Sequence, residues 1–246
     1  MKALLKLSLP LLLIAYGNAQ NISSVTSHDE KADLRPSPLV EQVTTEITTY
    51  NSLGSSRSKE VRVLNGQHLP TTIIEYGQND AIRARTTFAY DSSGKRSTGA
   101  KIERFGPDNG YASESEFYEY DADGRLTGIS YKDRTDKGIK QASVVYGPDG
   151  KPALLNVKGT FMGNAKGENG TGNSDREVTE AIKIPKETIM DRTLNALGDV
   201  VKEGEKEYEY KYDGNGNWTK KTEYIVLNGT RIKVGQLRRS IKYRRG

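Results

Sequence analysis

Cysteine is absent from the 246 residues of the chain, and histidine occurs only at His28 and His68. Without a thiol the chain can form no disulfide, carry no catalytic cysteine and attach no lipid through a lipoprotein cysteine. With no cysteine and only two histidines, His28 in a polar N-terminal segment and His68 just after a hairpin turn, the sequence gives no support to most nucleophile–histidine and zinc schemes. We therefore assign no catalytic residue and no metal ligand, and we expect no cofactor.

Long apolar runs are also missing, except at the start of the chain. Lys2 and Lys6 precede an apolar stretch at residues 7–14, which is too short to cross a bilayer. Small residues follow at 17–19. We interpret residues 1–19 as a secretory signal peptide, with an N-terminal anchor helix as the alternative. The chain is then an exported bacterial protein, periplasmic or secreted. It is not a lipoprotein and has no transmembrane segment after signal removal.

The next segment, residues 20–41, is polar, contains Pro36 and Pro38, and shows no sustained period, so we interpret it as a flexible linker. Residues 42–246 form the predicted β domain. Loss of the signal would leave 35 basic and 32 acidic residues, a net charge of +3 that is ordinary for a globular protein.

The predicted β domain is rich in tyrosine, threonine, valine and isoleucine, and its apolar residues alternate with period two. Val43, Thr45 and Ile47 would share one face of a strand. The pattern predicts an all-β fold, an antiparallel meander of repeated β-hairpins, curled into a barrel-like or sandwich form that covers the tyrosine face. Residues 174–184 fit either a helix capping box or a strand, and their apolar alternation favours the strand.

One turn pattern recurs along this domain: an aromatic residue, Asp or Asn, two free positions and Gly. The Asp side chain can bond the backbone ahead of it, and the Gly accepts a positive φ. Two tighter turns, Asn65-Gly66 and Asn228-Gly229, have the usual sequence of a two-residue hairpin loop. The residues that we assign to the longer turns are Asp91, Gly94, Asp121, Gly124, Gly150, Asp213 and Gly216.

Two of these copies suggest a family. The run Tyr-Asp-x-x-Gly-Arg-Leu at residues 120–126 and the run Tyr-Asp-Gly-Asn-Gly-Asn-Trp-Thr at residues 212–219 closely resemble the YD (Rhs-type) repeats of bacterial secreted and surface proteins. The resemblance covers residues 42–243. It implies a β-repeat architecture and, for some relatives, binding to carbohydrate or to a cell surface.

Two further patterns each allow two interpretations. Tyr208, Tyr210 and Tyr212 share one strand face, which could stack on sugar rings or could be the buried face of the sheet. Residues 159–174 contain five glycines, which fit either a hairpin tip or a loop that gates a ligand.

The C-terminal hairpin is the predicted binding surface. From Thr230 onward the chain has no acidic residue, and its apolar phase slips at Gly235, which predicts a β-bulge that re-aims the arginines that follow. Alternatively, these arginines pair across the sheet with glutamates near residues 205–209. The candidate binding residues are Trp218, Tyr224, Arg231, Lys233, Arg238 and Arg239.

These features favour a non-catalytic envelope or secreted protein that acts as a binding or scaffold module. The expected partner is an anionic polysaccharide or another envelope component, or else a second protein; nucleic acid is not expected. Two other functions stay open. One is a secreted hydrolase that acts on glycans through paired carboxylates. The other is an accessory or remnant of a YD-repeat toxin system that works by protein contact.

Overall fold

The computed structural model describes residues 33–36, 38–106, 110–162, 175–184 and 191–245. The predicted signal peptide, the predicted linker up to residue 32 and the glycine-rich residues 163–174 lie outside the described residues. Every regular element in the described part is a β-strand. No helix in that part could cross a membrane.

The described chain divides into two compact units. The larger unit comprises Lys31–Glu114 and Glu187–Gly246, and the smaller unit includes Ser115–Lys186. The strands of the larger unit are β1 (Val40–Asn51), β2 (Gly54–Leu64), β3 (Pro70–Tyr76), β4 (Ile82–Tyr90), β5 (Ser97–Gly106), β11 (Arg192–Leu194), β12 (Val200–Glu203), β13 (Lys206–Tyr212), β14 (Trp218–Leu227) and β15 (Thr230–Tyr243).

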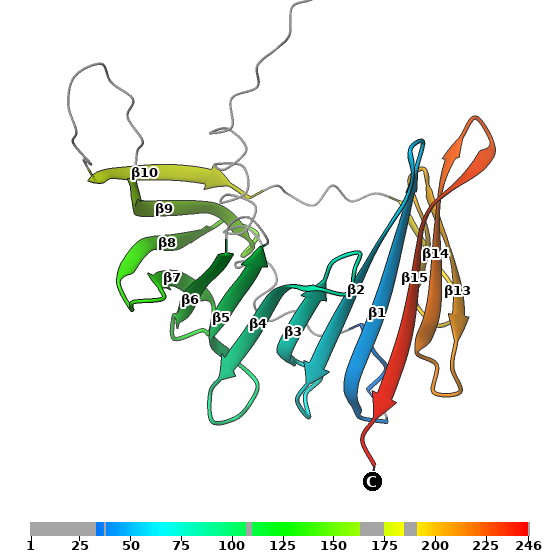
Figure 1. The fold of residues 1–246 in the computed structure, drawn as a ribbon, viewed down its shortest axis with the longest axis horizontal. Coiled ribbons are helices and arrows are strands. Elements are labelled where there is room, and N and C mark those ends of the chain that lie inside the picture. The colour runs from blue at the N-terminus through cyan, green and yellow to red at the C-terminus, as the bar shows by residue number, and fades with distance from the viewer. Residues whose placement is uncertain (1–32, 37, 107–109, 163–174, 185–190, 246) are drawn as a thin grey trace, which may run out of the picture. The chain divides into compact units, whose positions relative to one another are not determined.

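The sheet of the larger unit follows the chain except where its two ends meet. Its strand order is β5-β4-β3-β2-β1-β15-β14-β13-β12-β11, with antiparallel pairing at each step. Figure 1 shows β1 between β2 and β15. The pairing of β1 with β15 places the C-terminal hairpin beside the first hairpin of the domain.

The smaller unit is also an antiparallel meander. Its strands are β7 (Leu126–Asp133), β8 (Gly138–Tyr146), β9 (Pro152–Met162) and β10 (Asp175–Lys183). Strand β6 (Gly110–Tyr120) is divided between the units at residue 115. The all-β antiparallel meander of hairpins is therefore confirmed, and the strand interpretation of residues 174–184 is confirmed by β10.

The recurrent turns have the predicted conformation. Gly94, Gly124, Gly150 and Gly216 all have positive φ, between 68° and 79°. In the last of these turns Asp213 Oδ1 accepts hydrogen bonds from the backbone N–H groups of residues 215 and 217, at 2.9 and 3.0 Å. Asp121 holds the backbone of residue 125 in the same way, at 2.8 Å. The aspartate therefore shapes the turn, and the glycine closes it.

The prediction that Asn65-Gly66 forms a two-residue hairpin loop is wrong. Asn228-Gly229, in contrast, has positive φ at both residues, as such a loop requires. Strand β2 ends at Leu64 and β3 begins only at Pro70. Asn65 instead takes the place of the aspartate in the longer turn, since its Oδ1 accepts from the N–H groups of residues 67 and 69. His68, with φ 61°, stands where the other turns have glycine.

The tyrosine that precedes the turn has a structural role at two positions. The Tyr90 hydroxyl donates to the Pro70 carbonyl oxygen at 2.7 Å, and the Tyr146 hydroxyl donates to the Leu126 carbonyl oxygen at 2.9 Å. In both cases the last residue of one strand is fastened to the first residue of its hairpin partner. The tyrosine thus secures the open end of one hairpin while the residue after it starts the next turn.

Each unit has its own apolar core. In the larger unit Val40, Val43 and Leu64 are buried, and Leu34, Ile241 and Tyr243 pack against them. The buried hydrophobic residues of the smaller unit include Tyr118, Leu126, Ile129, Tyr131, Ala142, Val144, Leu155 and Val157.

Two bulges set the faces of the C-terminal hairpin. Glu223 is opposite Gly235 and Tyr224 is opposite Lys233, so Val234 is an extra residue in β15, beside the predicted bulge position. A Cβ at Gly235 would lie 2.7 Å from Glu223 Oε2, so any larger residue there would require the Glu223 side chain to shift. The bulge re-aims the residues after it, as predicted.

The second bulge was not predicted, and it lies in β14. Lys211 is opposite Lys220 and Tyr212 is opposite Trp218, so Thr219 is the extra residue. Because one extra residue moves the preceding side chain to the other face of the sheet, Trp218 joins the tyrosine face of β13.

Candidate functional site

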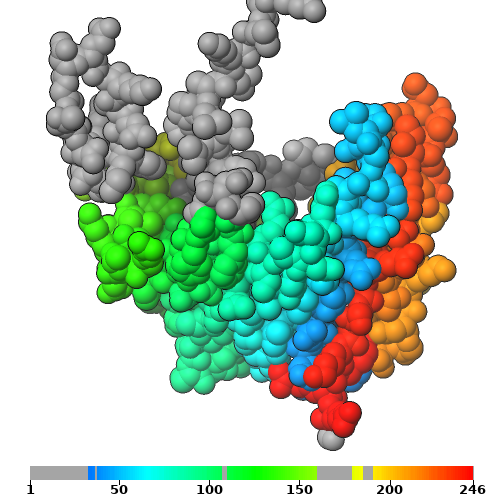
Figure 2. Space-filling model, in the orientation of Figure 1, coloured from blue at the N-terminus to red at the C-terminus, as the bar shows by residue number. Residues whose placement is uncertain are grey.

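One face of the larger unit, which we call the polar face, carries a cluster of charged and hydroxyl side chains on β15, β1 and β2. Glu46 on β1 is opposite Arg238 on one side and Lys59 on the other. One step along the strands, Thr48 is opposite Gln236 and Arg57. The space-filling view shows β15, in red, against β1, in blue (Figure 2).

These side chains surround a cavity of about 550 Å³, which is within the usual size range of a small-ligand site. Its lining residues are Glu46, Ile47, Thr48, Tyr50, Ser55, Arg57, Ser58, Lys59, Gly77, Gln78, Asp80, Gln236 and Arg238. All of them belong to the larger unit. The lining offers three cations, two carboxylates and several hydroxyl and amide groups, so it can hold a polar ligand with a negative charge.

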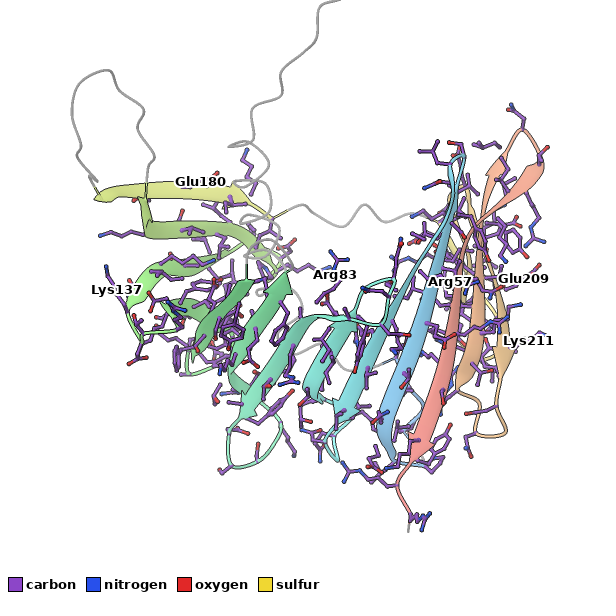
Figure 3. The ribbon with its side chains drawn as sticks, viewed as in Figure 1. Arg57, Arg83, Lys137, Glu180, Glu209 and Lys211 are labelled. Atoms are coloured by element: carbon purple, nitrogen blue, oxygen red, sulfur yellow. The ribbon has the colours of Figure 1, made fainter. Side chains whose placement is uncertain are left out.

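The charges of the cavity are not fully paired. Lys59 Nζ lies 2.5 Å from Asp80 Oδ1, and this hydrogen bond raises the pKa of Lys59. Within the described part of the chain, neither Arg57 nor Arg238 has an ion-pair partner within 4 Å. Arg238 is exposed, and it lies between Glu46 on β1 and Lys220 on β14. The two guanidinium groups can therefore bind an anion without breaking an ion pair. Figure 3 labels Arg57.

The tip of the C-terminal hairpin carries a second cluster on the same face, and this one is internally paired. Arg231 contacts Glu207 and Glu209, each at 2.9 Å, and its guanidinium lies 4.1 Å from the centre of the Tyr224 ring. The Tyr224 hydroxyl donates to Glu209 at 3.0 Å, and that bond, followed by the one from Arg231, lowers the pKa of Glu209. The sequence left open whether the arginines of this hairpin pair with glutamates near residues 205–209. The structure shows that pairing for Arg231.

Lys233 links the hairpin to the first strand of the domain. Its Nζ lies 4.4 Å from the centre of the Tyr50 ring and 3.1 Å from both the Tyr50 hydroxyl and Gln236 Oε1. Tyr50 and Gln236 both line the cavity. Lys233 therefore supports one wall of the cavity.

Trp218 and Arg239 lie on the opposite face of the hairpin. The Trp218 side chain is buried, and the Arg239 guanidinium lies 3.4 Å from the ring centre, at stacking distance. Only 15% of the Arg239 side chain is exposed, and its buried Nε has no hydrogen-bond partner among the described residues. Burial lowers the pKa of Arg239 to about 10, so the group stays charged at neutral pH.

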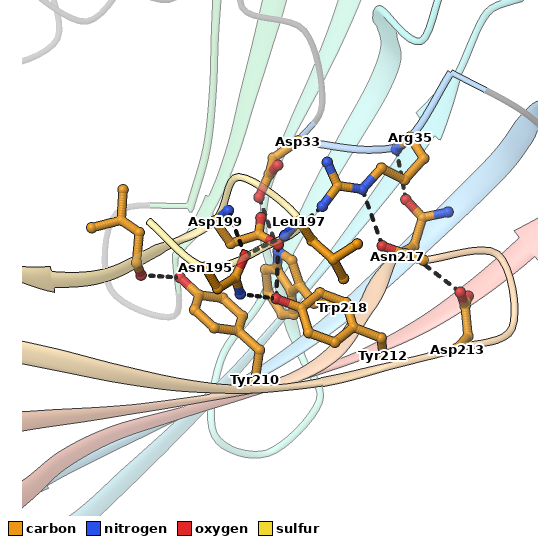
Figure 4. Close-up of polar contacts among 12 residues, drawn as sticks. Asp33, Arg35, Asn195, Leu197, Asp199, Tyr210, Tyr212, Asp213, Asn217 and Trp218 are labelled. Carbon is orange, nitrogen blue, oxygen red and sulfur yellow. Dashed lines mark hydrogen bonds and ion pairs between the residues drawn. The ribbon is translucent and has the colours of Figure 1, made fainter. Parts of the chain in front are cut away.

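Residues 33–35 hold this opposite face in place, in an arrangement that we call the clasp (Figure 4). Asp33 accepts from Trp218 Nε1 at 2.9 Å through its carboxylate and from Arg239 at 2.9 Å through its carbonyl oxygen. Arg35 donates to Asn217 Oδ1 at 2.7 Å and contacts Asp199 Oδ2 at 3.0 Å. The described end of the segment predicted as a linker is thus bonded to the sheet.

The tyrosine ladder belongs to the same structural face. The Tyr210 hydroxyl donates to the Val200 carbonyl oxygen, the Tyr212 hydroxyl donates to Asp199, and the Tyr210 ring meets the Trp218 ring edge-on. Burial is the main reason that the pKa values of both tyrosines are raised. These contacts support the interpretation of the ladder as a packed face.

The six candidate residues are therefore not brought together in one site. Trp218 and Arg239 lie on the clasp face, whereas the other four lie on the polar face, and of those only Arg238 lines the cavity. Sequence reasoning missed Arg57, Lys59 and Tyr50. The spacing of Arg57 and Lys59, two residues apart as on one strand face, is a usable signal, but their place beside Arg238 depends on the pairing of the two chain ends.

No protein family matches the chain, and no curated protein matches it. Among solved structures, a porin-like protein from Bacteroides uniformis is 10% identical, with 82% of this chain and 96% of that chain covered and a TM-score of 0.31. A LolA-superfamily protein from Nitrosomonas europaea is 13% identical, with 92% and 94% covered and a TM-score of 0.23. For TcdB2-TccC3 the identity is 11%, the coverage 75% and 14%, and the TM-score 0.21. These likenesses are too distant to indicate a function, and they do not identify YD repeats in the chain.

Proposed function

We propose that the chain is an exported, non-catalytic β-repeat protein that binds an acidic polysaccharide on the polar face of its larger unit. The observation that carries this proposal is the pair of arginines at the cavity. Arg57 and Arg238 line a polar space of about 550 Å³ and have no ion-pair partner within the described residues. A planar guanidinium binds a carboxylate or sulfate through two parallel hydrogen bonds, which makes arginine the suited residue for such ligands.

The repeat architecture of the proposal rests on the turns. The hydrogen bonds of Tyr90 and Tyr146 are equivalent, and the turns that follow both tyrosines close with a positive-φ glycine. We propose that these hairpins are YD-type repeats, in which the tyrosine and the turn serve the scaffold. Ligand recognition then depends on side chains outside the motif.

Retention on immobilised polygalacturonate across a salt series tests the proposal. The wild-type protein should be retained at low ionic strength and released as salt rises, because exposed charges are screened beyond about 8 Å at physiological ionic strength. The double variant R57S/R238S should flow through. K95S/K137S, which removes two exposed cations at other hairpin turns, is the matched control and should be retained.

Four results would contradict the proposal. The wild type could fail to bind, or R57S/R238S could bind as well as the control variant. Binding to anionic liposomes with none to polygalacturonate would point to a lipid surface instead. Release of reducing ends from the polysaccharide would favour the glycan hydrolase, with Glu46 and Asp80 as the carboxylates to replace first.

A further inference from the structure

A second cavity of the larger unit adjoins the first. It measures about 990 Å³ and is lined by residues of the β3–β4 turn and of the ends of β4, β5 and β6. Gly77 and Gln78 line both cavities, so the β3–β4 turn is their shared border. Its lining residues are Gly77, Gln78, Asn79, Ala81, Ile82, Arg83, Arg104, Phe105, Gly106, Gly110, Tyr111 and Ala112.

The strand register places this second cavity beside the polar face. Val61, two residues from Lys59 on β2, is opposite Ile74 on β3. Ile74 is opposite Arg85 on β4, and Arg85 is opposite Glu103 on β5. Side chains two residues apart on a strand share a face, so Phe105 lies on the same face as Glu103. The polar face therefore continues from Arg238 to Phe105.

An exposed aromatic pair stands at the far end of this face. Phe105 and Tyr111 are 36% and 46% exposed, and their ring centres lie 5.6 Å apart at an angle of 50°. The Tyr111 hydroxyl donates to Glu103 at 2.6 Å, and this bond is the main cause that lowers the pKa of Glu103. Arg85 and Lys101 also lie within 4 Å of Glu103, so the carboxylate that fixes the tyrosine is itself held.

A cation of the second cavity lies against the turn that borders both cavities. Arg83 is exposed and labelled in Figure 3, and a Cβ at Gly77 would lie 3.1 Å from its Cδ. The glycine thus leaves room for the aliphatic part of Arg83 to lie against the turn. Arginine side chains therefore line both cavities.

We infer that the polar face takes its ligand as an extended acidic sugar chain, with anionic units at Arg57 and Arg238 and a further sugar ring stacked on Phe105 and Tyr111. This inference rests on the proposed function. Exposed aromatic rings offer a large flat apolar area with little conformational freedom to lose, which suits the apolar face of a sugar ring. Two subsites that bind one chain gain affinity only when that chain is long enough to reach both.

The test is the affinity of the mature protein for oligogalacturonates of increasing length, from the dimer upward, measured by calorimetry at low ionic strength. For the wild type the affinity should rise by roughly tenfold or more once the oligomer spans both cavities. F105S/Y111S should keep the affinity for short oligomers and lose that rise. Y111F keeps the ring while removing the bond to Glu103, so it should keep the rise.

The outcomes separate the two proposals. If F105S/Y111S shows the same rise with length as the wild type, the extended-chain inference is wrong and the anionic site still stands. If R57S/R238S binds oligomers of every length as the wild type does, the proposed function itself is wrong. Denaturation midpoints of all variants confirm that each is folded, which is expected because both aromatic side chains are on the surface.

Discussion

Arg238 and Arg239 are neighbours in the sequence, yet their side chains lie on opposite faces of the sheet in different surroundings. Arg238 is exposed at a polar cavity and has no ion-pair partner among the described residues, whereas Arg239 is largely buried over Trp218 and bonded to Asp33. The bulge at Val234 decides which residue takes which face. The comparison shows that a run of basic residues is not one surface. On a strand, half of its side chains can pack within the fold while the other half face an open cavity.

The largest expected effect is on the clasp face. Trp218→Ala removes a buried indole, its hydrogen bond to Asp33 and its contact with Arg239, so the free energy of unfolding should fall by about 3–5 kcal/mol. Tyr224→Ala, on the polar face of the same strand, should cost well under half of that. Urea denaturation measures both. Equal losses would show that the two faces contribute equally to the free energy of unfolding.

The arginine pair gives the next largest difference. Arg239→Ser should lower the free energy of unfolding by about 2 kcal/mol, the size of a cation–π contact away from water. Arg238→Ser should change it by no more than about 0.5 kcal/mol, as for most exposed sites. The comparison of the two faces fails if Arg238→Ser proves the more destabilising variant.

The turn between β13 and β14, which contacts the clasp, contains a glycine that needs its positive φ and a second glycine that serves as the control. Gly216 has a φ of 76° and its carbonyl oxygen accepts from Arg35, whereas Gly214 has open space around it and no positive φ. Gly216→Ala should cost about 1–2 kcal/mol, because an L side chain resists the left-handed conformation. Gly214→Ala should leave the urea midpoint unchanged or raise it slightly. A similar loss in both variants would count against the assigned turn geometry.

The smallest effect is expected at an exposed turn of the smaller unit. The backbone N–H of Arg125, and then its side chain, lower the pKa of Asp121 below the ordinary aspartate value. Because the folded pKa is the lower one, the carboxylate stabilises the fold above about pH 4, and this contribution is lost as the pH falls through the folded pKa.

Asp121→Asn keeps an oxygen acceptor for the turn but has no charge to titrate. Its free energy of unfolding should therefore decline less steeply than that of the wild type between about pH 5 and pH 2. Urea midpoints over that range measure the slope. Identical slopes would mean that Asp121 does not couple folding to protonation.

Much of the fold could be predicted because its signals are local. The alternation of residues 43–48 and the turns that end in Gly94, Gly124, Gly150 and Gly216 specify hairpins from neighbouring residues alone. His68, Asp80 and Asp136 take the glycine position of the same turn with positive φ, so these three turns do not show the full motif in the sequence. Asn and Asp tolerate this conformation, and His is also enriched in it.

The candidate site was harder to predict because it depends on long-range pairing and on bulges. Nothing in residues 54–64 indicates that Arg57 lies two strands away from Arg238, since that follows from the pairing of β1 with β15. The extra residue at Thr219 moved Trp218 off the expected surface. The contacts of residues 33–35 join positions at opposite ends of the chain, where periodicity carries no information.

The most direct measurement of the central claim is the affinity of Arg238→Ser and Arg239→Ser for polygalacturonate, measured side by side at low salt. Both variants lose one positive charge, so non-specific attraction to the polyanion falls equally. If the cavity is the binding site, Arg238→Ser should weaken binding by roughly tenfold, the loss of one charged hydrogen-bonded contact. Arg239→Ser, tested under conditions in which its urea curve shows it to be folded, should remain close to the wild type. An equal loss in both variants would contradict the account, because binding would then follow net charge and not the polar face.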